Sequence, residues 1–200
     1  ALGRKALKLG TTEDKNMTIE IVSLGNELLS GRTENTNASW IARQLQKNGF
    51  TIGGITTLPD DTDCLRKKLL DMKASSQIII ITGGLGPTLD DVTRGVLADV
   101  FKTPLIFHQE LENDLIKRFG KSFDKLYSFK DQSTLPKGAT VIPNSIGTAS
   151  GFILKDHETA MIALPGVPTQ MKPMLLDSVV PFLNETIPQT IREEALFLCR

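Results

Sequence analysis

The residues best suited to chemistry lie in one run, QIIIITGGLGPTLDDVT, which covers residues 77–93. Four consecutive isoleucines lead into three glycines within four residues, and the adjacent carboxylates Asp90 and Asp91 follow. Glycine has no side chain, so backbone N–H groups in such a turn can approach an anion closely. Carboxylates repel phosphate, and their position here therefore indicates a bridging cation or a role in proton transfer. The run predicts a site for a phosphorylated ligand that is handled with the help of a metal.

That run requires a strand before it and a helix after it, and the sequence predicts both. The isoleucines are too apolar for a strand that is wetted on one face, and they are typical of a central parallel strand covered on both sides. Two similar strand–helix units come earlier in the chain. Three successive β–α units predict an α/β fold with a parallel sheet. The predicted strands are 19–24, 50–58 and 77–81, and the predicted helices are 36–47, 62–72 and the residues after Asp90.

In the second half of the chain, the predicted strands and helices follow one another at less regular intervals. Residues 151–154 and 159–164 flank a polar turn and predict a hairpin, and a helix is expected over 169–183. Residues 111–127 predict a helix that breaks at Gly120, and residues 130–132 predict a loop. In the second strand, the pair Gly53-Gly54 predicts a bulge or a loosened stretch.

Polar segments are predicted at the carboxyl ends of several strands. In an open α/β sheet, ligands bind outside these ends. The segments are 25–37, 59–61, 83–93 and 165–168, and the loop 145–150 could close over the same edge. We therefore expect one polar site at this edge. The competing interpretation is that turns anywhere are rich in Gly, Pro and Asp.

Asp60 and Asp91 are the strongest candidates for metal binding or acid–base work, because they come from different strand ends that should be neighbours. Asp60 is equally well explained as the N-cap of the next helix, and Asp90 as a charge at a helix start. Glu27 could cap a helix or bind a metal ion. The candidate metal ligands are Asp60, Asp90 and Asp91, and the candidate substrate-binding residues are Gly25, Glu27, Asn37, Gly83, Gly84, Gly86, Thr88, Thr93, Ser145, Gly147, Thr148, Pro165 and Gly166.

Composition excludes several classes of function. Lys plus Arg and Asp plus Glu both total 23, so the formal net charge is zero, and no basic run points to nucleic acid. No apolar stretch approaches the roughly 20 residues needed to cross a bilayer. The two cysteines, Cys64 and Cys199, and the two histidines, His108 and His157, are all far apart. This pattern disfavours zinc and indicates a reduced, cytoplasmic protein.

Familiar nucleotide and hydrolase motifs do not match. The order TGGLGPT differs from G-x-G-x-x-G, no Gly-Lys-Ser/Thr follows the glycines, and a G-x-S-x-G elbow does not occur.

Residues 1–16 precede Met17 and are expected to be a disordered leader or an expression remnant, because they have no apolar core of a signal peptide. Residues 17–187 are expected to form one domain, and 188–200 a linker towards a further domain.

Several motifs together resemble the amino-terminal domain of the CinA (competence/damage-inducible) family. They occur in the family's order over nearly the whole chain: GNELL with Gly31, Asn35-Thr36-Asn37, TGGLGPT with DDVT, Pro136-x-Gly138-Ala139, Pro143-Asn144 with GTAxG, and LPGVP with MKPM. The superfamily of molybdopterin-binding domains also contains MoaB, MogA and gephyrin.

The resemblance implies a three-layer α/β/α sandwich with a mostly parallel sheet, and a homodimer. It implies pyrophosphatase activity on ADP-ribose-like dinucleotides with a divalent metal (Mg, Mn or Co), a monovalent cation being a further candidate. Asp60 and Asp91 match two acidic positions of the molybdopterin-binding relatives, and Gly83, Gly84 and Gly86 match the shared glycine turn. The alternatives are a pterin-binding or pterin-adenylylating protein and a non-catalytic nucleotide-binding regulatory domain.

Three departures from the family pattern bear on activity. Asn26 stands where Thr is usual, Gln170 stands where a Glu is common, and SFKDQ at 128–132 replaces an Asn-Arg-Lys-Gln-like run. Gln170 removes a metal ligand that a Glu would offer. Lys130 supplies an arginine's charge without its bidentate geometry.

Overall fold

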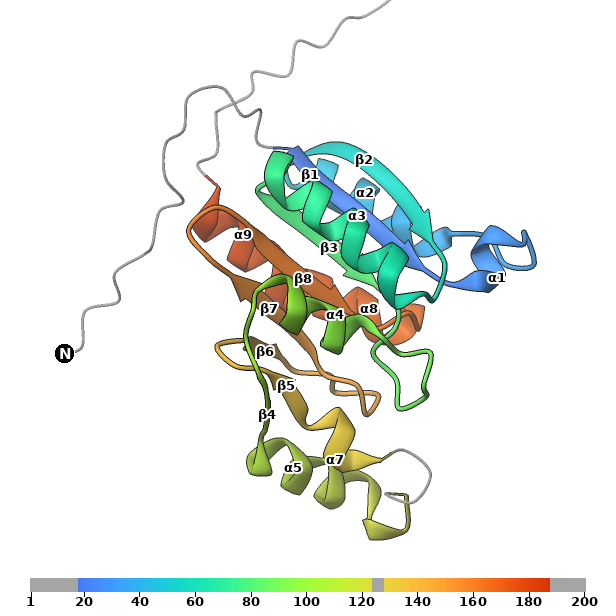
Figure 1. The fold of residues 1–200 in the computed structure, drawn as a ribbon, viewed down its shortest axis with the longest axis vertical. Helices are drawn as coiled ribbons and strands as arrows, with labels where there is room; N and C mark the ends of the chain where they lie inside the picture. Colours follow the sequence, from blue (N-terminus) through green and yellow to red (C-terminus); the bar gives the residue numbers. More distant parts are fainter. Residues whose placement is uncertain (1–17, 124–127, 188–200) are drawn as a thin grey trace, which may run out of the picture.

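A six-stranded sheet lies between two layers of helices in the computed structural model, which describes residues 18–123 and 128–187 (Figure 1). In spatial order the strands are β2 (Thr51–Leu58), β1 (Thr18–Leu24), β3 (Ile78–Thr82), β8 (Ala160–Leu164), β7 (Gly151–Lys155) and β6 (Thr140–Ile142). The first four are parallel, whereas β7 runs antiparallel to both of its neighbours and forms the predicted hairpin with β8. The predicted three-layer α/β/α sandwich with a mostly parallel sheet is confirmed. The predicted leader 1–16 and linker 188–200 lie outside the described residues.

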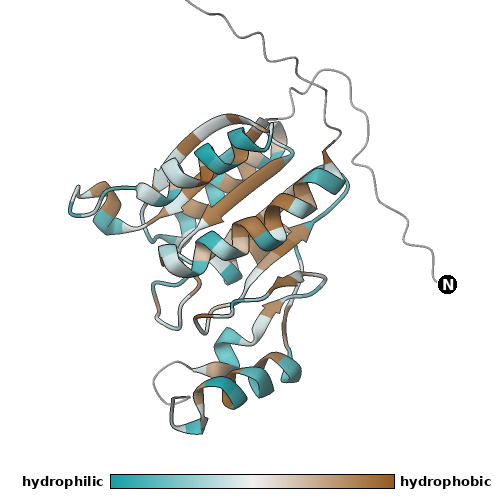
Figure 2. Cartoon of the chain, turned by 180° about the vertical axis from the view of Figure 1, so that it is seen from behind, coloured by the Kyte–Doolittle hydropathy of each residue, from teal (hydrophilic) through white to brown (hydrophobic). Residues whose placement is uncertain are grey.

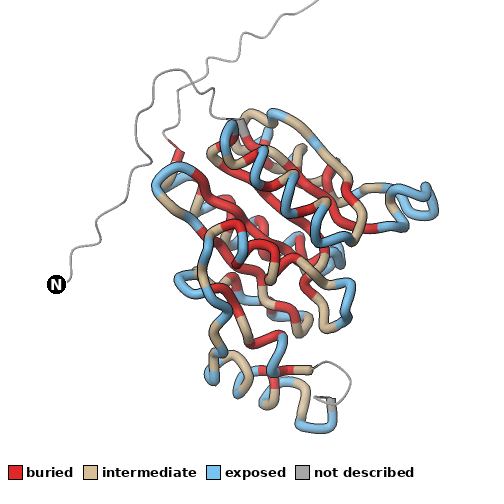
Figure 3. The backbone as a smooth tube through the Cα atoms, in the orientation of Figure 1, coloured by how far each residue is buried: buried red, intermediate tan, exposed pale blue. Residues whose placement is uncertain are grey.

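Strand β3 occupies the middle of the sheet and is buried along its whole length, as predicted (Figure 3). Side chains of a strand alternate between the two faces of the sheet. Ile78 and Ile80 accordingly pack in one core, and Ile79 and Ile81 pack in the other. Burying each such side chain stabilises the fold by about 2 kcal/mol. The four isoleucines therefore fix the strand whose end carries the glycine turn.

Each face of the sheet has its own helices, and their apolar sides face the strands (Figure 2). Helix α2 (Thr36–Lys47) covers one face together with a continuous run of α8 (Pro168–Met174), a π-helical turn η2 (Leu175–Val179) and α9 (Val180–Thr186). Helices α3 (Thr62–Ser75) and α4 (Thr93–Val100) cover the other face. No helix in the described parts of the chain is long and apolar enough to span a membrane.

The start and end of α2 follow directly from the sequence. The Asn35 side chain accepts a hydrogen bond from the Ala38 N–H group at 3.2 Å, which caps the helix. Gly49, with φ of 83°, follows the last turn in the left-handed conformation that favours glycine. The predicted bulge in β2 is also present, because Ile19 pairs with Ile52 whereas Glu20 pairs with Gly54.

The segment between α4 and β6 forms a small subdomain beside the main sheet (Figure 1). Its elements are β4 (Leu105–Phe107), α5 (Gln109–Phe119), η1 (Lys121–Phe123), α7 (Phe129–Gln132) and β5 (Thr134–Pro136), and β4 pairs antiparallel with β5. The predicted helix break at Gly120 is confirmed, and the last part of that prediction, 124–127, lies outside the described residues. The loop predicted over 130–132 is wrong, because these residues complete α7 around the buried Phe129.

Candidate functional site

The turn after β3 is shaped by two glycines that no other residue could replace without movement. Gly83 and Gly84 have φ of 108° and 66°. A Cβ atom on Gly83 would lie 2.8 Å from the carbonyl oxygen of Leu24, and one on Gly84 would collide with the Thr93 hydroxyl. Thr93 is fully buried, and its hydroxyl donates to the Gly83 carbonyl at 2.8 Å. Thr93, a predicted ligand contact, therefore supports the turn from behind.

Asp91 binds the turn itself. One carboxylate oxygen accepts from the Gly86 N–H at 2.7 Å, and the other accepts from the Thr88 N–H at 2.8 Å and the Thr88 hydroxyl at 2.6 Å. The Gly86 amide, predicted to face a phosphate, is thus already occupied. Neither Asp90 nor Asp91 caps a helix, because α4 begins at Thr93 without a side-chain cap.

Arg94 binds the same turn from the opposite side. Its guanidinium donates to the carbonyl oxygens of Leu85 at 2.6 Å and Gly86 at 2.8 Å, and the residue is only 9% exposed. Burial lowers the pKa of Arg94 below its ordinary value, although the nearby negative charges of Asp91 and Asp131 oppose this shift. Sequence reasoning missed Arg94, because a single arginine inside an amphipathic helix gives no signal of this contact.

Asp60 lies at the end of β2 and connects two strand-end segments. Its carboxylate accepts from the Asn26 N–H at 2.9 Å. Asn26 begins α1 (Asn26–Leu29), a single helical turn inside the polar segment 25–37. The interpretation of Asp60 as an N-cap is wrong, because Asp61 caps α3 by accepting from the Cys64 N–H at 2.7 Å.

A cleft of about 550 Å³ opens at this edge of the sheet. It brings together residues from all the segments predicted to converge, including both Asp60 and Asp91. Of the predicted substrate-binding residues, the cleft is lined by Gly25, Glu27, Gly83, Gly84, Gly86, Thr148, Pro165 and Gly166. Leu24, Leu85, Pro87, Gln132, Ala149, Val167, Pro168 and Gln170 complete the lining.

The other predicted residues lie outside this lining. Asp90 and Ser145 are exposed, and Thr88 hydrogen-bonds Asp91 as described. Asn37 lines a second, smaller pocket next to the cleft. Gly147 is not among the lining residues, and its N–H donates to the side chain of Asn144 at 2.8 Å.

Asn144 organises the loop 145–149, a role that sequence reasoning did not single out. It is buried and accepts from the N–H groups of Ile146 and Gly147, while its amide nitrogen donates to the Ala149 carbonyl and to Gln170 Oε1, each at 2.8 Å. Gln170 therefore fixes the loop that carries Thr148 into the cleft. A Glu at this position would keep an acceptor for Asn144.

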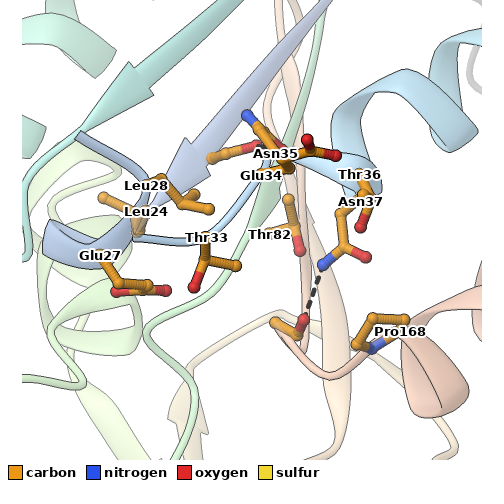
Figure 4. Close-up of a pocket in the computed structure, with 12 residues that line it drawn as sticks. Leu24, Glu27, Leu28, Thr33, Glu34, Asn35, Thr36, Asn37, Thr82 and Pro168 are labelled. Atoms are coloured by element: carbon orange, nitrogen blue, oxygen red, sulfur yellow. Dashed lines mark hydrogen bonds between the residues drawn. The ribbon is translucent and has the colours of Figure 1, made fainter. Parts of the chain in front are cut away.

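The smaller pocket has a volume of about 130 Å³ and lies between β1, α1 and the start of α2 (Figure 4). It shares Leu24, Glu27, Gly166 and Pro168 with the cleft. Asn37 reaches across from α2 and donates from its amide nitrogen to the Gly166 carbonyl at 2.6 Å (Figure 4). The two hollows are therefore neighbours that share part of their lining.

The charged side chains that line the cleft are all acidic: Glu27, Asp60 and Asp91. Among residues 18–123 and 128–187, no three His, Cys, Asp or Glu side chains gather closely enough to hold a metal alone. Mg²⁺ is commonly held by one or two carboxylates, with waters and substrate phosphates completing its shell. Asp60 and Glu27 fit that pattern, since Asp60 Oδ1 and both carboxylate oxygens of Glu27 accept no hydrogen bond from the described residues.

The architecture and the cleft define a three-layer α/β/α protein with a ligand site at the carboxyl edge of its sheet. A family model described as a probable molybdopterin binding domain matches residues 20–185. The chain therefore belongs to the molybdopterin-binding domain family.

Relatives within this family support the resemblance to CinA. A CinA-like protein of Trichodesmium erythraeum is 40% identical over 170 residues, which cover 84% of this chain and 40% of that protein. A putative competence-damage inducible protein of Acetivibrio thermocellus is 38% identical over 171 residues, with coverages of 84% and 41%. The chain thus spans less than half the length of these curated relatives.

Solved structures give the same fold. The protein CinA of Thermoplasma acidophilum matches with a TM-score of 0.74 and 28% identity over 82% of this chain and 96% of that one. The tungsten cofactor synthesizing protein MoaB of Pyrococcus furiosus matches with a TM-score of 0.54 and 17% identity over 86% and 97%. The second likeness concerns the fold alone.

Proposed function

We propose that this chain hydrolyses the pyrophosphate bond of ADP-ribose or a similar dinucleotide with the help of a divalent ion. The observation that carries the proposal is the cleft, which combines a glycine turn, two acidic strand ends and no basic lining residue. The resemblance to the CinA family supplies the substrate class. The whole protein's activities, a homodimer and a monovalent cation are further proposals that rest on the same resemblance.

The glycine turn offers amides to phosphate at two positions. The N–H groups of Gly84 and Leu85 belong to residues that line the cleft, and they donate to no acceptor among the described residues. Unpaired amides in a glycine turn are suited to bind phosphate oxygens and to stabilise charge that develops on them. Gly86 and Thr88 have a different role, because their amides hold Asp91.

The carboxylates divide into two roles. Asp60 and Glu27, with unoccupied oxygens, would hold the ion, and Asp91 would position the turn. A bound Mg²⁺, Mn²⁺ or Co²⁺ would supply the positive charge that an anionic ligand needs in this acidic cleft. A water molecule would attack one phosphorus and the other phosphate would leave, so that ADP-ribose gives AMP and ribose 5-phosphate. Leu24 and Ala149 contribute apolar lining to the cleft.

A second candidate is binding or adenylylation of a pterin, as in molybdenum cofactor biosynthesis. The family description names molybdopterin, and the MoaB structure shares the fold. A non-catalytic nucleotide-binding domain is the third candidate. It predicts binding of the same ligands with no product under any metal.

The deciding experiment incubates the protein with ADP-ribose, NAD, FAD, coenzyme A and a molybdopterin precursor, each with Mg²⁺, Mn²⁺ or Co²⁺. Release of AMP and ribose phosphate from ADP-ribose supports the proposal. Asp60→Asn should lower this turnover by at least about 100-fold, which corresponds to lost charge stabilisation. Asp99→Asn on the exposed side of α4 removes an equal charge outside the cleft and serves as the control. Equal activity of the two variants, or product only from the pterin precursor, would reject the proposal.

A further inference from the structure

Several side chains that line the smaller pocket beside the cleft can accept a hydrogen bond from whatever fills it. Three of its polar side chains already use a donor elsewhere. Ser23 donates its hydroxyl to Asn35 at 3.2 Å, Thr82 donates its hydroxyl to the Pro165 carbonyl at 3.1 Å, and Asn37 donates its amide to the Gly166 carbonyl. Each of these residues keeps oxygen lone pairs that are available to a ligand.

The remaining lining groups add to the same polarity. Glu27 and Glu34 contribute carboxylates, and no Lys or Arg is among the lining residues. Asn37 Oδ1 is buried and accepts no hydrogen bond from the described part of the chain. A buried acceptor without a donor destabilises the folded protein, so a ligand donor reached by a small turn of this amide would remove that cost.

Size distinguishes between the ligands that could supply such donors. A pocket of about 130 Å³ has room for a group of several heavy atoms and is large for a single bare cation. The described carboxylates do not gather in a group of three, as a metal site without other ligands would need. A neutral group with several hydroxyls fits both the size and the polarity.

We propose that this pocket binds the vicinal diol of one ribose of the dinucleotide. The inference rests on the proposed function, because that function places a phosphate in the adjoining cleft. Glu27 and Gly166 line both hollows, so a sugar attached to a phosphate at the glycine turn has a direct path into the pocket. The diol would donate to Asn37 Oδ1 and to the carboxylate of Glu34, and a deoxy sugar would leave these acceptors unpaired.

The test measures binding rather than turnover, by calorimetry at fixed Mg²⁺ with and without K⁺. The ligands are AMP, 2′-deoxy-AMP, 2′,3′-dideoxy-AMP, ribose 5-phosphate and 2-deoxyribose 5-phosphate. We expect at least one ribose compound to bind about tenfold more tightly than its deoxy partner, as one or two lost hydrogen bonds predict. Asn37→Ala should remove this preference, and Ser39→Ala, on the exposed side of the same helix, should keep it.

Two further variants separate the acceptor from its structural bond to Gly166. Asn37→Asp keeps an oxygen but loses the amide donor, so it should retain much of the preference for the ribose compounds. Glu34→Gln, at an exposed position, should weaken the preference in a chain that folds normally. Equal binding of ribose and deoxyribose compounds by the native protein overturns the inference, as does a stabilising effect of K⁺ alone with no sugar preference. A sugar preference without hydrolysis of ADP-ribose retains the inference and rejects the pyrophosphatase.

Discussion

Asp91 and Arg94 are three residues apart near the start of α4, and both hydrogen-bond the backbone of the glycine turn. Asp91 does so as an acceptor and Arg94 as a donor. Asp91 accepts from the N–H groups of Gly86 and Thr88, whereas Arg94 donates to the carbonyl oxygens of Leu85 and Gly86. The backbone between 85 and 88 is therefore fixed from both sides. This arrangement leaves the amides of Gly84 and Leu85 as the donors that the turn can offer to a ligand.

Asp91→Asn should destabilise the protein by about 2 kcal/mol, because the carboxylate receives three hydrogen bonds and an amide keeps only one oxygen to accept them. Urea unfolding followed by circular dichroism measures the change. Asp90→Asn is the matched control, since the neighbouring residue is exposed, and it should change stability by no more than about 0.5 kcal/mol. Equal losses for the two variants would show that Asp91 does not hold the turn.

Arg94→Met should cost about 3 kcal/mol, because two buried carbonyl groups lose their donor at once. Arg94→Lys should recover only part of this loss, since an ammonium lacks the two-pronged geometry of the guanidinium. Thermal and chemical unfolding of both variants tests whether stability falls from the native protein to the lysine variant and then to the methionine variant. Lys67→Met on the exposed side of α3 removes the same charge and should be nearly neutral. A lysine variant as stable as the native protein would contradict the two-carbonyl contact.

The strands of this protein are more predictable from its sequence than the contacts of its site. The isoleucine run of β3 and the cap at Asn35 depend on local patterns, so they were predictable. The roles of Asp91 and Asp60 were not, because each depends on which backbone amide lies nearby after folding. Asn144 and Gln170 are 26 residues apart, and no local sequence pattern indicates that they are in contact.

Asp156 in the β7–β8 turn should make stability depend on pH. Partial burial raises the pKa of Asp156, but hydrogen bonds from Lys73, Glu158 and Thr159 and the charge of Lys73 together hold it below its ordinary value. A carboxyl with a lowered folded pKa contributes stability above its unfolded pKa, about 4, and this contribution is lost as the pH falls through the folded pKa.

We therefore expect Asp156→Asn to lower the free energy of unfolding at pH 7 by at most about 1 kcal/mol, because solvent screens this partly exposed pair. The difference from the native protein should shrink below about pH 4. Urea titrations at pH 7, 5 and 3 measure it. A difference that stays constant over this range would mean that the ionised carboxylate has no part in the turn.

Gly147 and Gln170 should show energetic coupling. A Cβ atom on Gly147 would collide with the amide of Gln170, which in turn binds Asn144. Gly147→Ala alone should cost about 2 kcal/mol and loosen the loop 145–149. In the background of Gln170→Ala the same substitution should cost less by about 1 kcal/mol, because the collision is gone. A double-mutant cycle checks this, and strict additivity would contradict the close approach of the two positions.

The subdomain between α4 and β6 leaves and rejoins the main domain at a single place. The Lys137 N–H donates to the Pro104 carbonyl at 2.8 Å, and Leu105 pairs with Pro136 across the two strands. The two ends of this 105–136 excursion are therefore already adjacent, so a tight connection could replace all of it. Such a shortened chain would lose the part of the cleft lining that Gln132 forms, and it would also lose Leu135 from the main core. Substitutions in this module could thus alter ligand choice, as long as the buried Leu135 keeps its place in the core on this face of the sheet.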